Sequence, residues 1–511
     1  MTDTVVTRAG RREWTGLAVL VLPTLLLSID MSVLHLAVPK LSADLRPSGT
    51  ELLWINDVYG FLIAGFLITM GSLGDRIGRR KLLLIGAAAF GVASALAAYA
   101  PSAELLIAAR ALLGVAGATL MPSTLSLISN MFRDPSQRTV AISLWMTGFT
   151  GGLVLGPVVG GVLLENFWWG SVFLLGVPVM ALLLAAGPFL LPEYRDPGSG
   201  RIDLPSVLLS LAAILPVIYG LKEIAAYGAS LVPVLAVLAG LAVGVLFVAR
   251  QRRLADPLVD MRLFAVRPFS ASLAAMMIVV LVGPGLGLLT AQYYQLVLGL
   301  SPLEAGLWSL PQAGAIIAGF VVTPMLARRF RPAHVITAGL LAGAAGVALV
   351  TRADLAAVVA GQVIFFLGVS PLWVLGTDLI VGSAPPERSG SASSLSESVQ
   401  EFGGALGLAL FGSIATAVYR SRMEVPDGVA PGAAEAARDT LGAAAEVAGD
   451  LPAGPGGALL DAARAAFTGG LQVAAVAGAV IVVVAAVLAA VYLRHVPPTA
   501  RESEPEPVSV P

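Results

Sequence analysis

Residues 71–81 read GSLGDRIGRRK, a polar and basic segment between two apolar stretches at 51–71 and 82–100. A bilayer core is crossed by a helix of about 20 apolar residues, and both stretches have about that length. The glycines of the segment permit two helix ends to approach closely, and Asp75 can pair with a nearby arginine. The basic residues at 79–81 are expected to hold this loop at one membrane surface. The segment therefore predicts a tight connection between two membrane-spanning helices.

The whole chain has the composition of a membrane protein. Of its 511 residues, 57% are hydrophobic and only 12% are charged, with a mean hydropathy of +0.87, whereas a soluble domain is about 25% charged. The net charge of −1 gives no basic footprint for nucleic acid. Cysteine is absent and only three histidines occur, so we expect no disulfide, no thiol catalysis, no metal site and no cofactor.

Apolar runs predict an all-α protein with fourteen membrane spans. The expected spans are 14–38, 51–71, 82–100, 104–128, 139–162, 170–191, 204–222, 229–249, 269–295, 302–326, 334–351, 355–381, 392–419 and 467–493. The first span is too long for a signal peptide and has no small-residue cleavage site, so we expect it to be retained.

The distribution of basic residues predicts the orientation. An even number of spans places both termini on one side, and most of the arginines and lysines fall there, including the clusters at 76–81 and 250–267. Because excess Lys and Arg mark the cytoplasmic face, both termini are predicted to be cytoplasmic. The Ala-, Gly- and Pro-rich stretch 421–466 would then be extracellular, either as a passive linker or as short amphipathic helices around 431–449. The Pro- and Glu-rich tail after Val496 is expected to be disordered.

Four acidic residues fall inside predicted spans: Asp30, Asp57, Glu397 and Glu401. Each charge at the centre of a membrane helix costs about 2.5–3.5 kcal/mol on insertion scales, so such residues usually serve a function. Glu397 and Glu401 are four residues apart and share one helix face. Two carboxylates this close cannot both be ionised cheaply in an apolar environment, so the pair is a candidate proton carrier. A buried acid bonded to a neighbouring helix is the structural alternative.

An arginine, Arg110, lies within the fourth span together with Gly114 and Gly117. An intramembrane arginine usually faces a charged partner or a watery cavity. Proton coupling is therefore one interpretation, and a structural arginine bonded to neighbouring carbonyls is the other.

Trp54, Asp57 and Phe61 lie on one stripe of the second span. An aromatic face beside a carboxylate can hold a delocalised cation, with about 0.5–2 kcal/mol from each cation–π contact. An interfacial tryptophan anchor is the alternative. Further candidate cavity residues, for which packing is an equal alternative, are Tyr293, Tyr294, Trp308, Gln312 and Trp373. His35 lies near the expected outer mouth and could act as a gate or pH sensor.

Four motifs together resemble those of the major facilitator superfamily. Residues 71–81 match the signature G-x-L-a-D-r-x-G-r-k-x, and Leu106–Gly117 resemble l-x-x-x-R-x-x-x-G-x-g. The fifth span reads GGLVLGPVVGG at 151–161, which is similar to the motif of drug:proton exporters, and 28–41 resemble a first-span motif whose acid is Asp30. The residues that the resemblance assigns to conformational motifs are Gly71, Gly74, Asp75, Arg76, Gly78, Arg79, Gly156, Pro157, Gly160 and Gly161.

The chain is most similar to the fourteen-span drug:proton antiporters, in particular to quaternary-ammonium multidrug efflux transporters. This resemblance implies a six-helix bundle at 14–191, a linker at 192–268 with two extra helices, and a second six-helix bundle at 269–496 around a central cavity. Segments 1–13 and 497–511 would be cytoplasmic.

The implied function is proton-coupled efflux of lipophilic cations, dyes and antibiotics across a bacterial inner membrane by a monomer. Proton coupling would depend on Asp30, Glu397, Glu401 and Arg110. An exporter of one antibiotic or natural product is the alternative. An ATP-driven pump is rejected because no G-x-x-x-x-G-K-[ST] loop occurs. A membrane sensor is disfavoured by the transport motifs, and an enzyme by the lack of a nucleophile–base set.

Overall fold

The computed structural model describes residues 9–47, 49–195, 203–228, 230–254, 257–385, 389–426 and 429–498, and these contain helices and no strand. The first half contains α1 (Arg11–Leu45), α2 (Gly49–Ile77), α3 (Arg79–Ala98), α4 (Ala103–Met131), α5 (Pro135–Asn166), α6 (Ser171–Leu174), α7 (Gly176–Leu190), α8 (Leu204–Tyr227) and α9 (Leu231–Gln251). The second half contains η1 (Met261–Ala265), α10 (Arg267–Val280), α11 (Val282–Gln292), η2 (Tyr293–Val297), α12 (Pro302–Arg329), α13 (Pro332–Leu349), η3 (Val350–Arg352), α14 (Leu355–Gly382), α15 (Ser389–Arg422), α16 (Pro431–Asp439), α17 (Leu441–Gly449) and α18 (Ala453–Tyr492).

The prediction of fourteen membrane spans is confirmed, since fourteen stretches of the described chain are long and apolar enough to cross a bilayer. Three predicted spans are each assembled from shorter pieces. The sixth combines α6 and α7, the ninth combines α10, α11 and the π-helical turn η2, and the eleventh combines α13 and η3. Most helices also extend beyond the predicted apolar runs, because polar end turns continue the helix into the interface.

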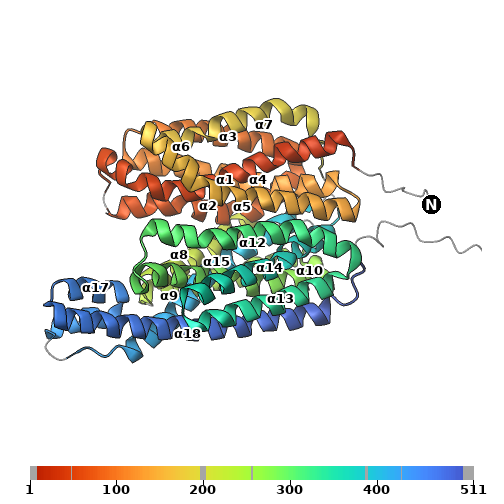
Figure 1. Ribbon diagram of the computed structural model, residues 1–511. Coiled ribbons are helices and arrows are strands. Elements are labelled where there is room, and N and C mark those ends of the chain that lie inside the picture. The colour runs from red at the N-terminus through yellow and green to blue at the C-terminus, as the bar shows by residue number, and fades with distance from the viewer. Residues whose placement is uncertain are drawn as a thin grey trace, which may run out of the picture.

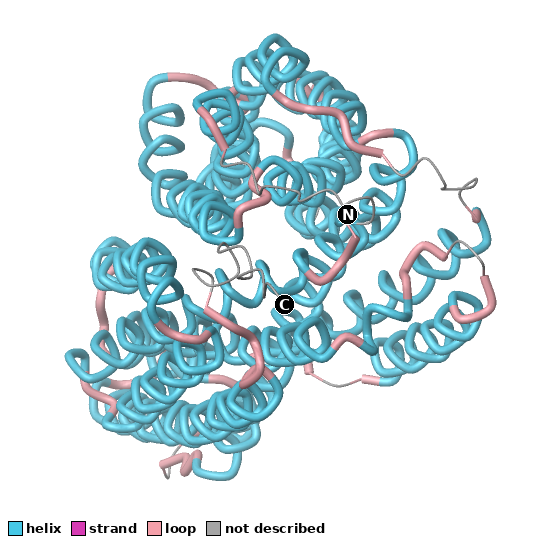
Figure 2. The backbone as a smooth tube through the Cα atoms, turned by 90° about the vertical axis from the view of Figure 1, so that its right-hand side faces the viewer, coloured by secondary structure: helices cyan, strands magenta, loops and turns pink. Residues whose placement is uncertain are grey.

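The spans form two bundles that lie side by side (Figure 1). In the N-terminal bundle α1 packs on α5 and α7, and α4 packs on α2 and α3. In the C-terminal bundle α14 packs on α12 and α13, and α18 packs on α13, α15 and α10. The start of α1 and the end of α18 lie on the same side of the molecule (Figure 1), and Figure 2 shows the helices viewed from that side. We call this side the terminal face and the other side the opposite face.

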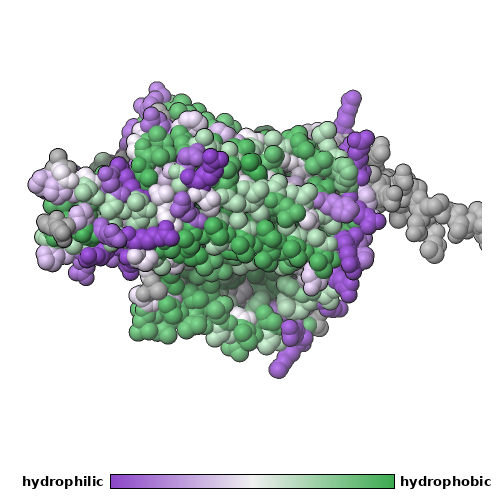
Figure 3. Space-filling model, turned by 60° about the horizontal axis from the view of Figure 1, so that its bottom comes forward, coloured by the Kyte–Doolittle hydropathy of each residue, from purple (hydrophilic) through white to green (hydrophobic). Residues whose placement is uncertain are grey.

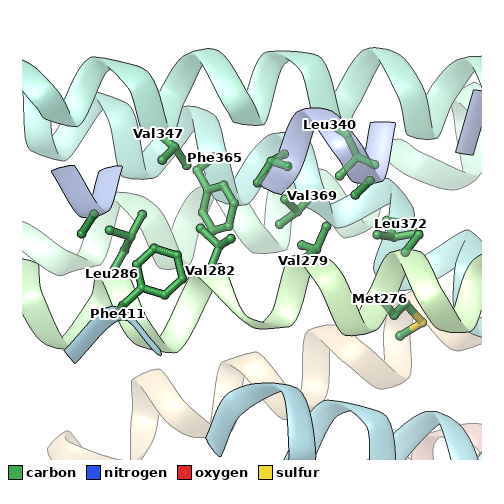
Figure 4. Packing of buried hydrophobic residues seen from close by; sticks show 14 of the residues in the cluster. Met276, Val279, Val282, Leu286, Leu340, Val347, Phe365, Val369, Leu372 and Phe411 are labelled. Atoms are coloured by element: carbon green, nitrogen blue, oxygen red, sulfur yellow. The ribbon is translucent and has the colours of Figure 1, made fainter. Parts of the chain in front are cut away.

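The interior of the C-terminal bundle is packed with apolar side chains from α10, α11, α13, α14 and α15 (Figure 4). Glycines bring α13 and α14 into backbone contact, because a Cβ atom on Gly346 would lie only 2.6 Å from the carbonyl oxygen of Gly361. A Cβ atom on Gly368 would likewise lie 2.4 Å from the Gly339 carbonyl oxygen. Small residues of this kind are what allow membrane helices to associate by close packing.

The outer surface of the spans is apolar, as a belt of hydrophobic residues between two polar ends shows (Figure 3). Large side chains that are more than half exposed include Val92 on α3, Phe189 on α7 and Val245 on α9. A soluble protein rarely exposes apolar patches of this extent. The chain is therefore a multi-pass membrane protein whose sides are covered by lipid.

The two extra helices, α8 and α9, form a hairpin outside the two bundles. The α8 helix packs against both α2 and α15, so the hairpin covers a seam where the bundles meet. At the terminal face Asp203 accepts hydrogen bonds from Arg250 Nε at 2.7 Å and from Arg250 Nη2 at 2.9 Å, which ties the start of α8 to the end of α9. These bonds from Arg250, with a further one from Ser206, lower the pKa of Asp203 to about 2. A mainly apolar pocket of about 620 Å³ lies between α8, α9 and Phe402 of α15.

The segment 421–466 is more helical than a passive linker would be. Two short helices, α16 and α17, occupy most of 431–449, as one of the two sequence interpretations predicted. The last membrane helix, α18, begins at Ala453, and α15 continues to Arg422. These elements project beyond the two bundles at the opposite face (Figure 1).

Candidate functional site

The segment 71–81 joins the two bundles at the terminal face. Asp75, near the end of α2, accepts hydrogen bonds from the backbone N–H groups of Gly390 at 3.3 Å and Ser391 at 3.0 Å, and from the Ser391 hydroxyl at 3.2 Å. These groups belong to the first turn of α15, where the helix dipole is positive and unpaired N–H groups favour an anion. The Asp75 carboxylate therefore holds the C-terminal bundle against the N-terminal bundle.

Arg79 lies in the seam between the bundles at the terminal face and is shielded from solvent. Its side chain is 1% exposed, it pairs with Asp75, and a Cβ atom on Gly390 would collide with its guanidinium group. The carboxylate four residues earlier supplies the counter-charge that makes burial of an arginine tolerable. Arg80, in contrast, lies at the surface and donates to the carbonyl oxygens of Pro188 and Leu191.

The glycines of the segment permit these contacts. A Cβ atom on Gly71 would lie 2.5 Å from Ser394 of α15, and one on Gly74 would lie 2.4 Å from Arg79 Nη1. Gly78 has a φ of +113°, which disfavours residues with a side chain. Arg76 donates from Nε to the hydroxyl of Ser72 at 3.3 Å within α2.

A second set of bonds between the bundles joins α5 to α12 and α14 near the terminal face. Asp378 of α14 pairs with Arg138 of α5 and accepts a hydrogen bond from the Thr139 hydroxyl at 2.7 Å. Arg328 of α12 donates to the hydroxyl of Ser136 at 3.1 Å. The hydrogen bonds that join the bundles thus gather at the terminal face, so the bundles are closed against each other at that end.

The first part of α15 lies in this closed seam and is rich in serine. Its buried serines are Ser389, Ser391, Ser393, Ser394, Ser396 and Ser398. The Ser389 hydroxyl contacts Ser126 and Asn130 of α4, while those of Ser396 and Ser398 have no partner within the described part of the chain. The seam therefore has a polar lining of small hydroxyl groups.

Asp30 and Arg110 form an ion pair inside the N-terminal bundle. Arg110 Nη1 lies 2.7 Å from an Asp30 carboxylate oxygen, and the Arg110 side chain is 2% exposed. Arg110 Nε also donates to the Ile55 carbonyl at 3.1 Å, and the guanidinium carbon lies 4.6 Å from the centre of the Tyr59 ring. Arg110 thus contacts both an acid, as the proton-coupling interpretation requires, and a backbone carbonyl, as the structural interpretation requires.

The glycines that follow Arg110 hold α4 against its neighbours. A Cβ atom on Gly114 would lie 2.7 Å from the carbonyl oxygen of Tyr59, and one on Gly117 would lie 3.3 Å from side chains of α1 and α2. The close approach of α2 to α4 places Tyr59 over Arg110.

The glycine-rich motif of α5 contacts α1 through one of its faces only. A Cβ atom on Gly152 would lie 2.0 Å from the Ser28 hydroxyl, and one on Gly160 would lie 2.7 Å from Val33. Gly156, midway between them, is buried. A Cβ atom on Gly161, in contrast, would have no neighbouring atom within 4 Å, so close helix contact does not explain a glycine there. The Pro157 side chain falls outside the described part of the structure.

Glu397 and Glu401 lie one turn apart on α15. Glu397 is 6% exposed and Glu401 is half-buried. The α15 helix that carries them packs on α2 and α4 of the N-terminal bundle and on α8 of the hairpin. Tyr59 of α2 lies against Arg110 of α4. The two glutamates therefore lie on the helix that faces the helices carrying Tyr59 and Arg110.

The stripe of Trp54, Asp57 and Phe61 carries a cation that the sequence interpretation missed. Lys222 Nζ lies 2.8 Å from Asp57 Oδ1 and 4.8 Å from the centre of the Phe61 ring. The Trp54 and Phe61 rings lie 6.4 Å apart, and Trp54 is 47% exposed. A lysine inside the predicted span 204–222 was the available signal, because only Lys40, Lys81 and Lys222 are lysines in the chain.

Residues 20–408 match the Major Facilitator Superfamily. The chain belongs to this superfamily. It is 48% identical over 494 residues to the multidrug efflux pump LfrA of Mycolicibacterium smegmatis, covering 96% of this chain and 98% of LfrA. It is 34% identical to the methyl viologen resistance protein SmvA of Salmonella typhimurium, covering 89% and 93% of the two chains. The fold resembles that of the human organic anion transporter MFSD10, with a TM-score of 0.60, 15% identity and coverage of 95% and 98%.

Membership of the superfamily agrees with the transporter fold and not with an enzyme. Among the described residues no group of three or more metal-ligating side chains occurs. Several charged side chains of the spans form ion pairs, among them Arg110 with Asp30 and Lys222 with Asp57.

The predicted cavity residues of the second half divide into two groups. Tyr293 and Tyr294 are 2% and 3% exposed, and the Tyr293 hydroxyl donates to the Ala353 carbonyl oxygen, so both tyrosines pack in the core. Trp308 is 43% exposed and Gln312 is half-buried on α12. Trp373 packs against the cores of both bundles, and its indole N–H has no partner among the described residues. Trp373 therefore remains the best-placed candidate of the five, and the side chain of His35 lies outside the described residues.

Proposed function

We propose that this chain is a multidrug efflux pump that exchanges protons for lipophilic cations. LfrA, to which the chain is 48% identical over nearly its whole length, is a multidrug efflux pump. SmvA is named for resistance to methyl viologen, a doubly charged organic cation. The alignment with each covers at least 89% of both chains, so the likeness includes both bundles and the extra hairpin.

The observation that carries the proton-coupling proposal is the charged cluster at the interface between the bundles. Asp30 pairs with Arg110 in the N-terminal bundle, and Glu397 and Glu401 lie one turn apart on α15, which packs on α2 and α4 of that bundle. An antiporter needs an acid that exchanges its proton as the bundles move, and an acid at a moving interface changes its surroundings in each cycle. A protonated acid would release a cation, and a deprotonated acid would bind the next one.

We infer an orientation and a state from the charges and the closed seam. The terminal face carries Arg11, Arg12, Arg80, Arg328 and Arg329, and an excess of basic residues marks the cytoplasmic side. Because the bonds between the bundles gather at this face, the conformation is closed to the cytoplasm and faces outward. Each net positive charge that enters in exchange contributes about 2.3 kcal/mol per 100 mV of membrane potential.

The test is ethidium efflux in proteoliposomes with an imposed pH gradient. Glu397→Gln and Asp30→Asn are expected to abolish proton-driven efflux, while Glu397→Gln retains ethidium exchange without a gradient, which proves that the variant is folded. The matched control is Asp439→Asn on α16, an exposed acid paired with Arg420 outside the bundles, and it should transport normally. Proton-driven efflux at the wild-type rate in both variants would refute the assignment.

A further inference from the structure

Lys222 belongs to the extra hairpin and yet reaches into the N-terminal bundle. Its ammonium group lies 2.8 Å from Asp57 Oδ1 and 4.8 Å from the Phe61 ring centre. It lies in the last turn of the span Leu204–Ile224, where a lysine can extend toward the membrane interface. Its side chain instead contacts α2, and a connection between α8 and α9 does not require that contact.

Packing on both sides fixes the position of α8 in the seam. A Cβ atom on Gly65 of α2 would lie 2.8 Å from Leu215 of α8. On the other side Val217 and Leu221 of α8 form an apolar cluster with Ala405 and Ala409 of α15. Leu221 directly precedes Lys222, so contact with α15 aims the next side chain toward α2. Lys222 therefore pairs with Asp57 of the N-terminal bundle, while its neighbour Leu221 packs on Ala405 of α15, one turn after Glu401.

The ion pair between Lys222 and Asp57 is accessible to solvent and can separate at small cost. The side chains of Lys222 and Asp57 are 35% and 42% exposed, whereas the Arg110–Asp30 pair is 2% and 11% exposed. An ion pair that water can reach is worth little, typically 0.2–1 kcal/mol. A ligand with a positive charge and a flat aromatic body could therefore take the place of the ammonium group beside Asp57, Phe61 and Trp54.

We propose that Lys222 is a tethered competitor of the substrate. It occupies the cation position beside Asp57 and Phe61 in the empty transporter, and a lipophilic cation binds by displacing it. The displaced ammonium group has Glu401 of the C-terminal bundle as its alternative partner, so binding at one bundle changes the charge balance at the other. The inference rests on the proposed export of cations and adds the residue that sets affinity for them.

The experiment measures equilibrium binding of ethidium and methyl viologen to the purified full chain in lipid nanodiscs. Lys222→Met should bind both cations more tightly, by about fivefold, the upper limit for release of a solvent-reachable ion pair. Lys222→Gln is a second neutral variant that can still hydrogen-bond to Asp57 and should behave similarly. Lys222→Arg should remain within about twofold of wild type because it keeps the charge.

A double-mutant cycle separates competition from a purely structural pair. If Lys222 acts by occupying Asp57, the gain from Lys222→Met disappears when Asp57→Asn is already present. The matched control is Lys40→Met, since Lys40 donates to the backbone carbonyl of Leu164 and pairs with no acid among the described residues, and its affinities should be unchanged. Unfolding temperatures of all variants confirm folding.

The outcomes are distinct for the two proposals. Equal or weaker cation binding by both Lys222→Met and Lys222→Gln would overturn the role of Lys222. Failure of the wild-type protein to bind either cation would instead refute the cation-export function on which the inference rests.

Discussion

Replacing Asp75 with asparagine should open the terminal face. In the closed state the Asp75 carboxylate accepts three hydrogen bonds from Gly390 and Ser391 and is the counter-ion of a buried Arg79. The substitution is isosteric, so it removes the negative charge with little change in volume. Without the carboxylate, the Arg79 guanidinium is buried and unpaired in the closed state. In the open state water can reach the guanidinium, so the substitution destabilises the closed state selectively.

The magnitude follows from these contacts. Removing one partner of a buried ion pair costs about 3–5 kcal/mol, and loss of a charge at a helix N-terminus costs up to about 2 kcal/mol. Taking about 3 kcal/mol as the lower value, the ratio of closed to open molecules should fall by about a hundredfold, since 1.4 kcal/mol corresponds to a factor of ten.

Distances between spin labels provide the assay. The chain contains no cysteine, so labels at Arg133→Cys and Arg329→Cys, two exposed residues at the terminal face, report only the separation of the bundles. Asp75→Asn should move the distance distribution toward longer values.

Asp354→Asn is the matched control, because Asp354 also caps a helix, accepting from the Ala357 N–H at 2.8 Å, but within one bundle. An unchanged distribution in Asp75→Asn, or an equal change in both variants, would refute the reasoning.

Two further predictions concern packing and acid stability. Gly152→Leu should lower the unfolding temperature, by the equivalent of about 1–3 kcal/mol for an overpacked contact, because a Cβ atom at this position would lie 2.0 Å from the Ser28 hydroxyl. Gly151→Leu should leave the unfolding temperature unchanged, since a Cβ atom there would have no neighbouring atom within 4 Å. Equal unfolding temperatures of the two variants would contradict this prediction. The pKa of Asp203 is lowered to about 2 by its bonds to Arg250 and Ser206. The pair therefore stabilises the hairpin above the unfolded pKa of about 3.9 and the contribution is lost as the pH falls toward 2. Asp203→Asn should remove this part of the acid dependence, measured as unfolding temperature against pH between 5 and 2, and an unaltered profile would show that the pair does not contribute.

The sequence predicted the spans because length and hydropathy are local properties. It also predicted that Arg110 would face a partner, since an intramembrane charge needs one. The burial of Arg79 could not be predicted, because it depends on α15, which lies about three hundred residues later in the chain and covers the side chain. The sequence could not show whether Tyr293 and Tyr294 face the core or a cavity, because their orientation depends on the π-helical turn that contains them.

The contact between Lys222 and Asp57 could not be predicted from the sequence either. The sequence contains an aromatic and acidic stripe on α2 and a lysine on α8, but no spacing rule connects residues 165 positions apart. Their contact arises because α8 packs on both α2 and α15.

The serine-rich first turns of α15 determine how easily the closed seam can be wetted. Burying apolar surface there would contribute about 25 cal/mol for each Å² removed from water, and all of it would be lost at every opening. The buried hydroxyl groups of Ser389, Ser396 and Ser398 can instead form hydrogen bonds with water molecules when the bundles separate. The adhesion between the bundles is thus concentrated in a few ionic contacts, and the surface between those contacts parts and re-forms at small cost, as a gate that cycles continuously requires.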